Sequence, residues 1–280
     1  MNPLMHFHVI TLFPEMIESA ARFGVVGQAL NAGKLSLTTL SPRKFTSNVH
    51  QTIDDRPFGG GDGMIMMAEP AALALESILE SLQDRPKRVI HFSPRGVPLT
   101  DKKVRELGQF PDLILIASRY GGIDQRFLNK YVNEEISIGD YVLSGGELPA
   151  LALIDAVSRI LPGVLGNEAS PEEESFSQAT GLLEHPQYTR PREWRGEEVP
   201  GGLLTGNHAG IEEWREALSL FVTLERRPDL LTSERLAKVT HKRLDKFRKI
   251  FSGLSVSELQ AAGLSNPDLV KERLMNLKGT

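Results

Sequence analysis

The chain has 280 residues, which is long enough for one large domain or two domains of ordinary size. Its net charge of −4 does not mark it as a nucleic-acid binder, and the lack of cysteine excludes disulfides, thiolate metal sites, iron–sulfur clusters and a cysteine nucleophile. No apolar run is long enough to cross a membrane, and residues 1–10 do not resemble a secretion signal, so we expect a cytoplasmic protein.

Strand-like and helical segments alternate from residue 7 to residue 118. The strand-like segments are 7–13, 34–42, 88–94 and 112–118. Helices are predicted from Pro14 to Gly24, from residue 68 to residue 83, and from Thr100 onward. Apolar strands separated by helices predict an α/β domain with a parallel sheet covered on both faces, in which ligands bind beyond the carboxyl ends of the strands.

The composition changes after a helix that is predicted from near Gly146 to around Pro162. Residues 166–202 are acidic, polar and rich in glycine and proline, so we place an interdomain linker in the first part of this segment. The remainder has a helical pattern, and its residues 238–250 carry six lysines and arginines against one aspartate. This basic segment is either a solvated helix face or a contact for nucleic acid.

Four glycine-containing corners lie at or near the ends of predicted strands. They are residues 56–64, 93–99, 118–126 and 137–150. None has the glycine pattern of a dinucleotide-binding turn or of a phosphate loop, which disfavours the ordinary nucleotide sites. Glycines let a ligand approach main-chain groups closely, so the corners suit a flat heterocycle recognised by the backbone; the alternative is that they are only tight turns.

Two charged positions also leave alternatives open. Asp155 and Arg159 stand four residues apart on the helix after the last corner, where an exposed ion pair is the default interpretation and a functional arginine the alternative. By itself, the acidic triplet at residues 172–174 is typical of a solvated loop.

The order of eight motifs closely resembles the bacterial TrmD family of tRNA (guanine-N1)-methyltransferases, from about residue 7 to about residue 230. The motifs are DDRPFGGGDGM (54–64), SPRG (93–96), RYGGID (119–124), EEISIGDYVLSGGELPA (134–150), GVLGNEAS (163–170), ESF (174–176), GLLEHPQYTRP (181–191) and GNHAGIEEWR (206–215). So many motifs in one order are a specific signal, although the last 50 residues resemble the family only weakly.

The resemblance implies a SPOUT-class α/β fold with a deep trefoil knot in the N-terminal domain and a small helical C-terminal domain. It divides the chain into a methyltransferase domain at 1–165, a linker at 166–185 and a tRNA-binding domain at 186–280. It further implies a homodimer that binds S-adenosylmethionine in the knot, grips the anticodon arm of tRNA and methylates guanosine 37.

Matching the motifs by position assigns contacts with the methyl donor to three knot loops. By resemblance, these residues are Ser93, Pro94, Gly96, Ser118, Tyr120, Ile138, Gly139, Asp140, Tyr141, Val142, Leu143, Gly145, Gly146 and Pro149.

The chemistry of the reaction requires two further groups. Guanine N1 carries a proton at neutral pH, so a base, suitably a carboxylate, must remove it as the methyl group transfers. The negative charge that develops on O6 would be stabilised by a guanidinium. The resemblance matches Arg159 to the family's arginine and Glu174 to the family's aspartate base, with one more methylene in the side chain.

Three other positions depart from the family pattern. Ser118 stands where the family has glycine, Gly121 where it has glutamate, and Arg95 where it commonly has glutamine. In the family that glutamate is connected with a magnesium requirement, so the metal site is left open. The alternative function is an RNA-binding protein that keeps the fold and has lost catalysis; an enzyme for a different nucleotide is disfavoured by the missing phosphate motifs.

Overall fold

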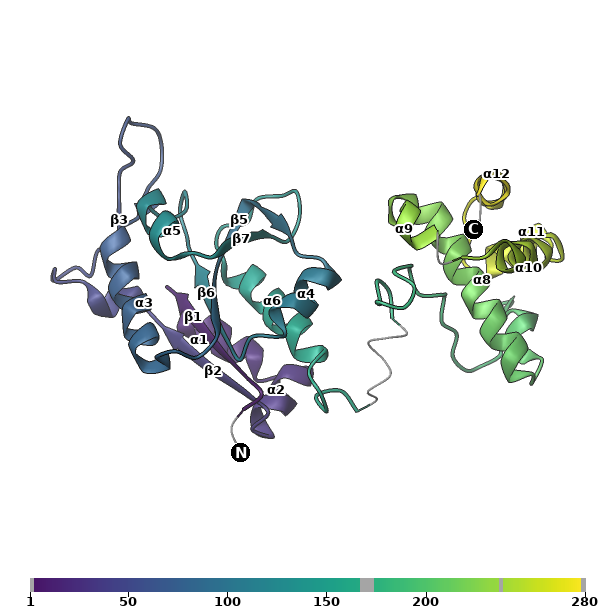
Figure 1. The fold of residues 1–280 in the computed structure, drawn as a ribbon, viewed down its shortest axis with the longest axis horizontal. Coiled ribbons are helices and arrows are strands. Elements are labelled where there is room, and N and C mark those ends of the chain that lie inside the picture. Colours follow the sequence, from purple (N-terminus) through teal and green to yellow (C-terminus); the bar gives the residue numbers. More distant parts are fainter. Residues whose placement is uncertain (1–2, 167–173, 237–238, 278–280) are drawn as a thin grey trace. The chain divides into compact units, whose positions relative to one another are not determined.

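The computed structural model describes residues 3–166, 174–236 and 239–277, which Figure 1 shows as a ribbon. The chain divides into two compact units, Met1–Glu168 and Ala169–Thr280. The first unit is an α/β layered structure, and the second is mostly helical. The expected α/β fold with a parallel sheet is therefore confirmed for the first unit.

A five-stranded sheet lies at the centre of the first unit, in the order β2-β1-β6-β5-β7. All of its neighbouring strands pair in parallel. The strands are β1 (Met5–Thr11), β2 (Leu35–Leu40), β5 (Lys87–Pro98), β6 (Asp112–Ala117) and β7 (Glu134–Ser137). Parallel strands end at the same edge, so the loops after β5, β6 and β7 gather at one end of the sheet.

The middle strand β6 shows how the sheet is buried on both faces. Every residue of β6 is buried, and its side chains alternate between two clusters. Leu113, Leu115 and Ala117 belong to one cluster, whereas Ile114 and Ile116 belong to the other. This alternation follows from the two-residue period of a strand and gives the unit a core on each side of the sheet.

Helices cover both faces of the sheet (Figure 1). One face carries α1 (Pro14–Ala21), α2 (Gly24–Asn31), α4 (Asp101–Leu107) and α6 (Glu147–Arg159). The other face carries α3 (Ala68–Leu82) and α5 (Gln125–Tyr131). A 3₁₀ helix, η1 (Pro42–Phe45), and the antiparallel strands β3 (Asp54–Asp55) and β4 (Ile65–Met66) complete the unit.

The four predicted strands and the helices from Pro14, Ala68, Thr100 and Gly146 are confirmed within a few residues. The prediction that Gly24 ends the first helix is wrong. That helix ends at Ala21, and Gly24, with φ of +63°, redirects the chain into α2. Glycine permits this left-handed backbone conformation, so the same residue type marks a helix start here instead of a helix end.

The second unit is built around the long helix α8 (His208–Arg226). The other helices are α9 (Ser233–Leu236), α10 (His241–Ser252), α11 (Val256–Ala261) and α12 (Pro267–Asn276), with the 3₁₀ helices η2 (Gly201–Leu204) and η3 (Pro228–Leu230). A two-stranded hairpin of β8 (Glu193–Trp194) and β9 (Glu197–Glu198) precedes them. The core of the unit includes Trp214, Phe221 and Phe251, so these helices form a separate hydrophobic core.

The basic segment at 238–250 contains most of α10, and part of its charge is neutralised within the unit. Arg243 forms an ion pair with Glu216 of α8, and Lys246 forms one with Glu213 at 2.7 Å. Lys242 and Lys249 are exposed. The helix therefore uses some of its cations for internal packing and presents others to solvent.

None of the helices in the described ranges combines the length and the apolar composition that a membrane crossing needs.

Candidate functional site

A cleft of about 1200 Å³ opens at the carboxyl end of the parallel sheet. Its lining includes residues from all four glycine corners that the sequence singled out. The corners at 118–126 and 137–150 follow β6 and β7 directly, and residues 92–95 lie in the middle of β5. The prediction that a ligand site would lie beyond the carboxyl ends of the strands agrees with this position.

The cleft brings together most of the residues that the resemblance assigned to the methyl donor. Those that line it are Ser93, Pro94, Ser118, Tyr120, Ile138, Gly139, Tyr141, Val142, Leu143, Gly145, Gly146 and Pro149. Gly96 and Asp140 are not part of this lining. Asp140 is exposed, whereas a Cβ on Gly96 would lie 2.5 Å from the backbone of Glu135 and Ile136, so Gly96 lets β5 approach β7.

The glycine pair before α6 holds the loop against the end of β6. The Gly146 amide donates to the Ser118 carbonyl at 2.8 Å, and Arg119 and Gly145 form an isolated bridge. A Cβ on Gly146 would lie 2.6 Å from the Ala117 Cα, a distance that real Cβ atoms do not adopt. Glycine is therefore required here by close backbone approach.

The loop from Ser137 to Leu143 is fixed by contacts within itself. The Gly139 amide donates to the Ser137 hydroxyl at 3.2 Å, and the Tyr141 hydroxyl donates to the Ile138 carbonyl at 3.4 Å. Gly139 has φ of +149°, and a Cβ there would lie 2.5 Å from the Tyr141 ring. These contacts hold main-chain groups along the cleft in one conformation, which suits recognition of a ligand by the backbone.

A buried carboxylate anchors the start of α6 beneath the cleft. Glu147 is 1% exposed and accepts a hydrogen bond from the Thr11 hydroxyl at 2.9 Å. It also pairs with the Arg119 Nε at 3.1 Å, and the Arg119 guanidinium lies over the Phe13 ring, 4.5 Å from its centroid. Because a buried charge must be paired and hydrogen-bonded, this network ties β1, the loop after β6 and α6 into one unit.

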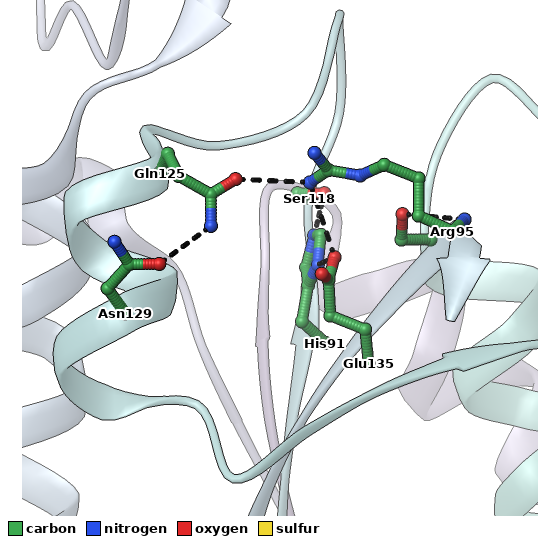
Figure 2. A network of polar contacts seen from close by, with 7 residues as sticks. His91, Arg95, Ser118, Gln125, Asn129 and Glu135 are labelled. Carbon is green, nitrogen blue, oxygen red and sulfur yellow. Dashed lines mark hydrogen bonds and ion pairs between the residues drawn. The ribbon is translucent and has the colours of Figure 1, made fainter. Parts of the chain in front are cut away.

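A second polar network lies beside the cleft, between β5, β6 and β7 (Figure 2). The buried His91 ring contacts the Glu135 carboxylate through Nδ1 at 3.0 Å and the Ser118 hydroxyl through Nε2 at 2.8 Å. Arg95 lies above it, with Nη2 3.3 Å from Gln125 Oε1 and 3.5 Å from Glu135 Oε1. Burial lowers the pKa of His91, and the contact with Glu135 offsets part of this effect.

The two residues matched to the reaction chemistry do not line this cleft. Arg159 is the last residue of α6 and is partly buried, at the opposite end of that helix from Gly146. Glu174 belongs to the second unit and is also partly buried. The neighbouring acidic residues 172 and 173 lie outside the described residues.

Three residues that could together bind a metal ion lie at the opposite end of the strands from the cleft, near the amino ends of β1 and β6. The ligand atoms of His6, His8 and Asp112 are all within 4.8 Å of one another. Asp112 is fully buried, with His8 Nε2 at 3.1 Å and Arg85 Nη2 at 3.0 Å. The buried carboxylate is thus paired with a histidine and an arginine, although its Oδ2 accepts no hydrogen bond within the described residues.

Comparison with known proteins decides the family. The family model described as tRNA (guanine-1)-methyltransferase TrmD matches residues 5–233. The chain belongs to the TrmD family. The match covers every described helix and strand of the α/β unit and continues through α8 of the helical unit.

Curated relatives support the same assignment. A protein of Methylobacillus flagellatus is 52% identical over 83% of this chain and 88% of its own length. Relatives from Methylococcus capsulatus and Shewanella woodyi are 49% and 51% identical, over 88% and 87% of this chain and 97% of their own lengths. All three are named tRNA (guanine-N(1)-)-methyltransferase.

Sequence reasoning missed the polar residues that support the cleft from below. His91, Glu135 and Glu147 are buried or partly buried and touch cleft-lining residues or their neighbours. A signal was present, since His91 interrupts the apolar run 89–92 of β5, and Glu147 stands in the first turn of α6, before its apolar residues. Their partners are distant in the sequence and were visible only once the strands were paired.

Proposed function

We propose that this chain transfers the methyl group of S-adenosylmethionine to N1 of guanosine 37 in tRNA, beside the anticodon. The observation that carries the proposal is the cleft built from four glycine corners at the carboxyl edge of the sheet, in a chain of the TrmD family. Its relatives at about 50% identity are named for guanine-N1 methylation of tRNA.

The cleft suits a methyl donor that contains a nucleoside. It combines main-chain groups held close by Gly139, Gly145 and Gly146 with apolar side chains such as Ile138 and Leu143. Such a surface binds a flat heterocycle through the backbone and does not need the phosphate motifs that this sequence lacks. We infer that the loops around the cleft belong to the deep trefoil knot of the SPOUT class.

In the proposed reaction, the carboxylate of Glu174 accepts the proton from guanine N1, and the freed electron pair attacks the methyl carbon. Arg159 donates hydrogen bonds to O6 and stabilises the negative charge that develops there. The donor supplies an electrophilic methyl group on a sulfonium; its sulfur keeps the electrons of the broken C–S bond and leaves as the thioether of S-adenosylhomocysteine.

The position of Arg159 supports a homodimer. The helix α6 has 13 residues, so it carries Arg159 about 20 Å away from the corner at Gly146 where its own chain's cleft lies. Val142, Leu148 and Tyr141, on or beside this corner, are each more than half exposed, as expected for side chains that another copy covers. We propose that Arg159 of one subunit serves the cleft of its partner.

We propose that the helical unit binds the anticodon arm of tRNA. The exposed cations of α10, including Lys242 and Lys249, suit contacts with phosphates. A tRNA substrate is consistent with a cytoplasmic location for the protein.

The glutamate that the family connects with magnesium is missing in this chain, where Gly121 takes its place. This residue has no carboxylate, and a side chain placed there would begin 3.2 Å from the Met64 carbonyl oxygen. The donor set at this position therefore does not fit the ion, and no step of the proposed reaction uses it.

A labelling assay tests the proposal against the alternative of an RNA-binding protein without catalysis. S-Adenosylmethionine with a tritiated methyl group should label a tRNA transcript that has guanosine at positions 36 and 37, and a parallel reaction with a chelator tests the metal requirement. Arg159→Ala and Glu174→Gln should abolish labelling and leave donor affinity, measured by calorimetry, nearly unchanged. Donor binding by the unaltered protein without any labelling would select the alternative.

A further inference from the structure

Ser118 lines the cleft at the end of β6, and a histidine that does not line the cleft contacts its hydroxyl from beneath. His91 is only 3% exposed, so solvent and ligand have little access to its ring. Its Nε2 lies 2.8 Å from the Ser118 Oγ, and its Nδ1 lies 3.0 Å from the Glu135 carboxylate (Figure 2). The two ring nitrogens therefore connect a carboxylate to the hydroxyl of a serine that lines the cleft.

The carboxylate determines the direction of these hydrogen bonds. An ionised carboxylate only accepts, so the proton of the neutral imidazole is on Nδ1, where it is donated to Glu135. Nε2 then has only a lone pair and accepts the hydrogen of the Ser118 hydroxyl. Because that hydrogen points away from the cleft, the Ser118 oxygen can offer a ligand only its lone pairs.

The groups around His91 maintain this arrangement. Glu135 of β7 and Arg95 of β5 are the charged residues in contact with the network, and Gln125 of α5 contributes a neutral amide. Gln125 donates in turn to Asn129 at 2.8 Å, so the rim above His91 is held by a chain of contacts (Figure 2). Burial disfavours the imidazolium form, so the pKa of His91 lies below its ordinary value and the neutral tautomer dominates at neutral pH.

We propose that His91 is a positioning residue that fixes Ser118 as a hydrogen-bond acceptor for an amino or hydroxyl group of the methyl donor. The inference rests on the proposed function, because it takes the ligand of the cleft to be S-adenosylmethionine. It adds to that function a specificity element built from His91, Glu135 and Ser118. A ligand with an acceptor at this place would meet the lone pairs of Ser118 and be rejected.

Two parts of S-adenosylmethionine could supply the donor group. One is the nucleoside, with its ribose hydroxyls and adenine amine, and the other is the ammonium of the amino-acid portion. 5′-Methylthioadenosine keeps the nucleoside and lacks the ammonium. An effect of His91 substitution on the affinity for both ligands places the contact on the nucleoside, whereas an effect on S-adenosylmethionine alone places it on the ammonium.

The test measures donor affinity by calorimetry in full-length variants. His91→Phe removes both ring nitrogens and should weaken S-adenosylmethionine binding roughly tenfold, the usual effect of losing one oriented hydrogen bond. His91→Gln places an amide oxygen near the position of Nε2 and should restore most of the affinity. Ser118→Ala should weaken binding as much as His91→Phe, and the double variant should be no weaker than either single variant. One change removes the acceptor and the other its orientation, so both act on the same hydrogen bond to the donor.

A matched control separates this role from a loss of stability. His8 is a second buried histidine of the same sheet with a carboxylate partner, Asp112, at the other end of the strands. His8→Phe should lower the melting temperature without changing donor affinity. In the labelling assay, His91→Phe should raise KM for the donor and leave kcat unchanged, a separation that simple destabilisation does not produce.

Different results would contradict the proposed function and the proposed role of His91 and Ser118. If the unaltered protein does not bind S-adenosylmethionine, the proposed function fails. If it binds and Ser118→Ala has unchanged affinity, the inference is overturned, and this variant decides the matter even if His91→Phe does not fold. Additive losses in the double variant would also overturn the link between the two residues.

Discussion

Gly146 is the residue at which the chain leaves the cleft and enters α6, and the space around it excludes any side chain. A Cβ there would lie 2.6 Å from the Ala117 Cα and 3.1 Å from the Ser118 amide nitrogen, which are backbone atoms of the central sheet and cannot move aside. A side chain at this position would therefore disturb both the loop that lines the cleft and the packing of α6 against β6.

Replacing this glycine should damage binding and stability together. We expect Gly146→Ala to lower the free energy of unfolding by about 2 kcal/mol, because the added methyl group forces β6 and α6 apart. Urea unfolding and calorimetry with S-adenosylmethionine measure the two effects. Gly201→Ala is the control, since a Cβ there meets no atom within 4 Å. Equal stability of the two variants would show that the contact at Gly146 relaxes easily.

Single residues of the cleft were predictable where backbone geometry demands a residue type. Gly145 and Gly146 could be found because glycine is the residue that permits such close approach. His91 and Glu147 could not be assigned in the same way, because a polar residue within an apolar run has many explanations until its partner is known. Their partners, Ser118 and Arg119, come from another strand end.

At the scale of elements, His6, His8 and Asp112 form a titratable cluster at the amino ends of β1 and β6. The rings of His6 and His8 stack with centroids 3.8 Å apart, and His8 contacts the buried Asp112. Burial, followed by repulsion from His8, lowers the pKa of His6 from 6.5 to about 4. Burial also lowers the pKa of His8, against the opposing effect of Asp112. At a given acidic pH, His6 and His8 are therefore less protonated in the folded chain than in the unfolded chain.

This difference predicts a loss of stability in acid. Between pH 6.5 and about 4, His6 takes up a proton in the unfolded chain and not in the folded one, so the free energy of unfolding falls as pH falls through this window. Above pH 6.5 the contribution is fully present. Urea unfolding at pH 7.5 and pH 5 should show a smaller difference for His6→Asn than for the unaltered protein. The exposed His50 provides the control, and an equal pH dependence in His6→Asn and His50→Asn would contradict the account.

Some cations of the helix α10 form ion pairs with another helix, and others are exposed to solvent. Arg243 and Lys246 pair with glutamates of α8, whereas Lys242 and Lys249 are exposed. Composition alone could not separate these tasks, because both kinds of cation belong to the same basic segment and the partners lie on another helix. The two interpretations of the basic segment are therefore not exclusive.

The exposed pair should contribute to tRNA affinity through phosphates. We expect Lys242→Ala with Lys249→Ala to weaken tRNA binding and to reduce the slope of log affinity against log salt by roughly 2, because each lysine neutralises one phosphate. Binding titrations over a range of salt concentrations measure this slope. Lys271→Ala, on the exposed face of α12, serves as the control variant. An unchanged slope in the double variant would place the RNA-binding surface elsewhere.

Prediction of elements succeeded where the hydrophobic pattern was long and regular. The buried strand β6 and the helix α3 show their periods clearly in the sequence. The elements α2, α5 and β7, with 8, 7 and 4 residues, were not predicted. The helices α1 and α4 are equally short, but Pro14 and Thr100 mark where they begin. β7 forms through its pairing with β5, which joins residues far apart in the chain.

At the scale of the whole molecule, the α/β unit contains the cleft, and the length of α6 takes Arg159 away from it. The helix predicted from near Gly146 to around Pro162 already implies this separation, because Arg159 stands 13 residues beyond Gly146. The separation has a simple consequence if Arg159 is catalytic. Under that proposal, the arginine and the donor at one reaction centre come from different subunits, and the smallest active species is a dimer.

Mixing two inactive variants tests this arrangement. Leu143→Arg places a long charged side chain in the cleft and should abolish donor binding, whereas Arg159→Ala should leave the cleft intact and remove the arginine. In a heterodimer, the intact cleft belongs to the Arg159→Ala subunit and is served by the arginine of the other subunit. Co-expression should therefore restore about a quarter of the labelling activity, since half of the dimers are mixed and each has one working site.

The same mixture made from subunits that each complete their own site would stay inactive, because no subunit then keeps both the cleft and the arginine. Analytical ultracentrifugation of the mixture confirms that dimers form. Two differently tagged subunits allow the mixed dimers to be purified and assayed alone. Labelling by the purified heterodimer, together with none by either parent homodimer, would establish that the reaction centre is shared between two copies of the chain.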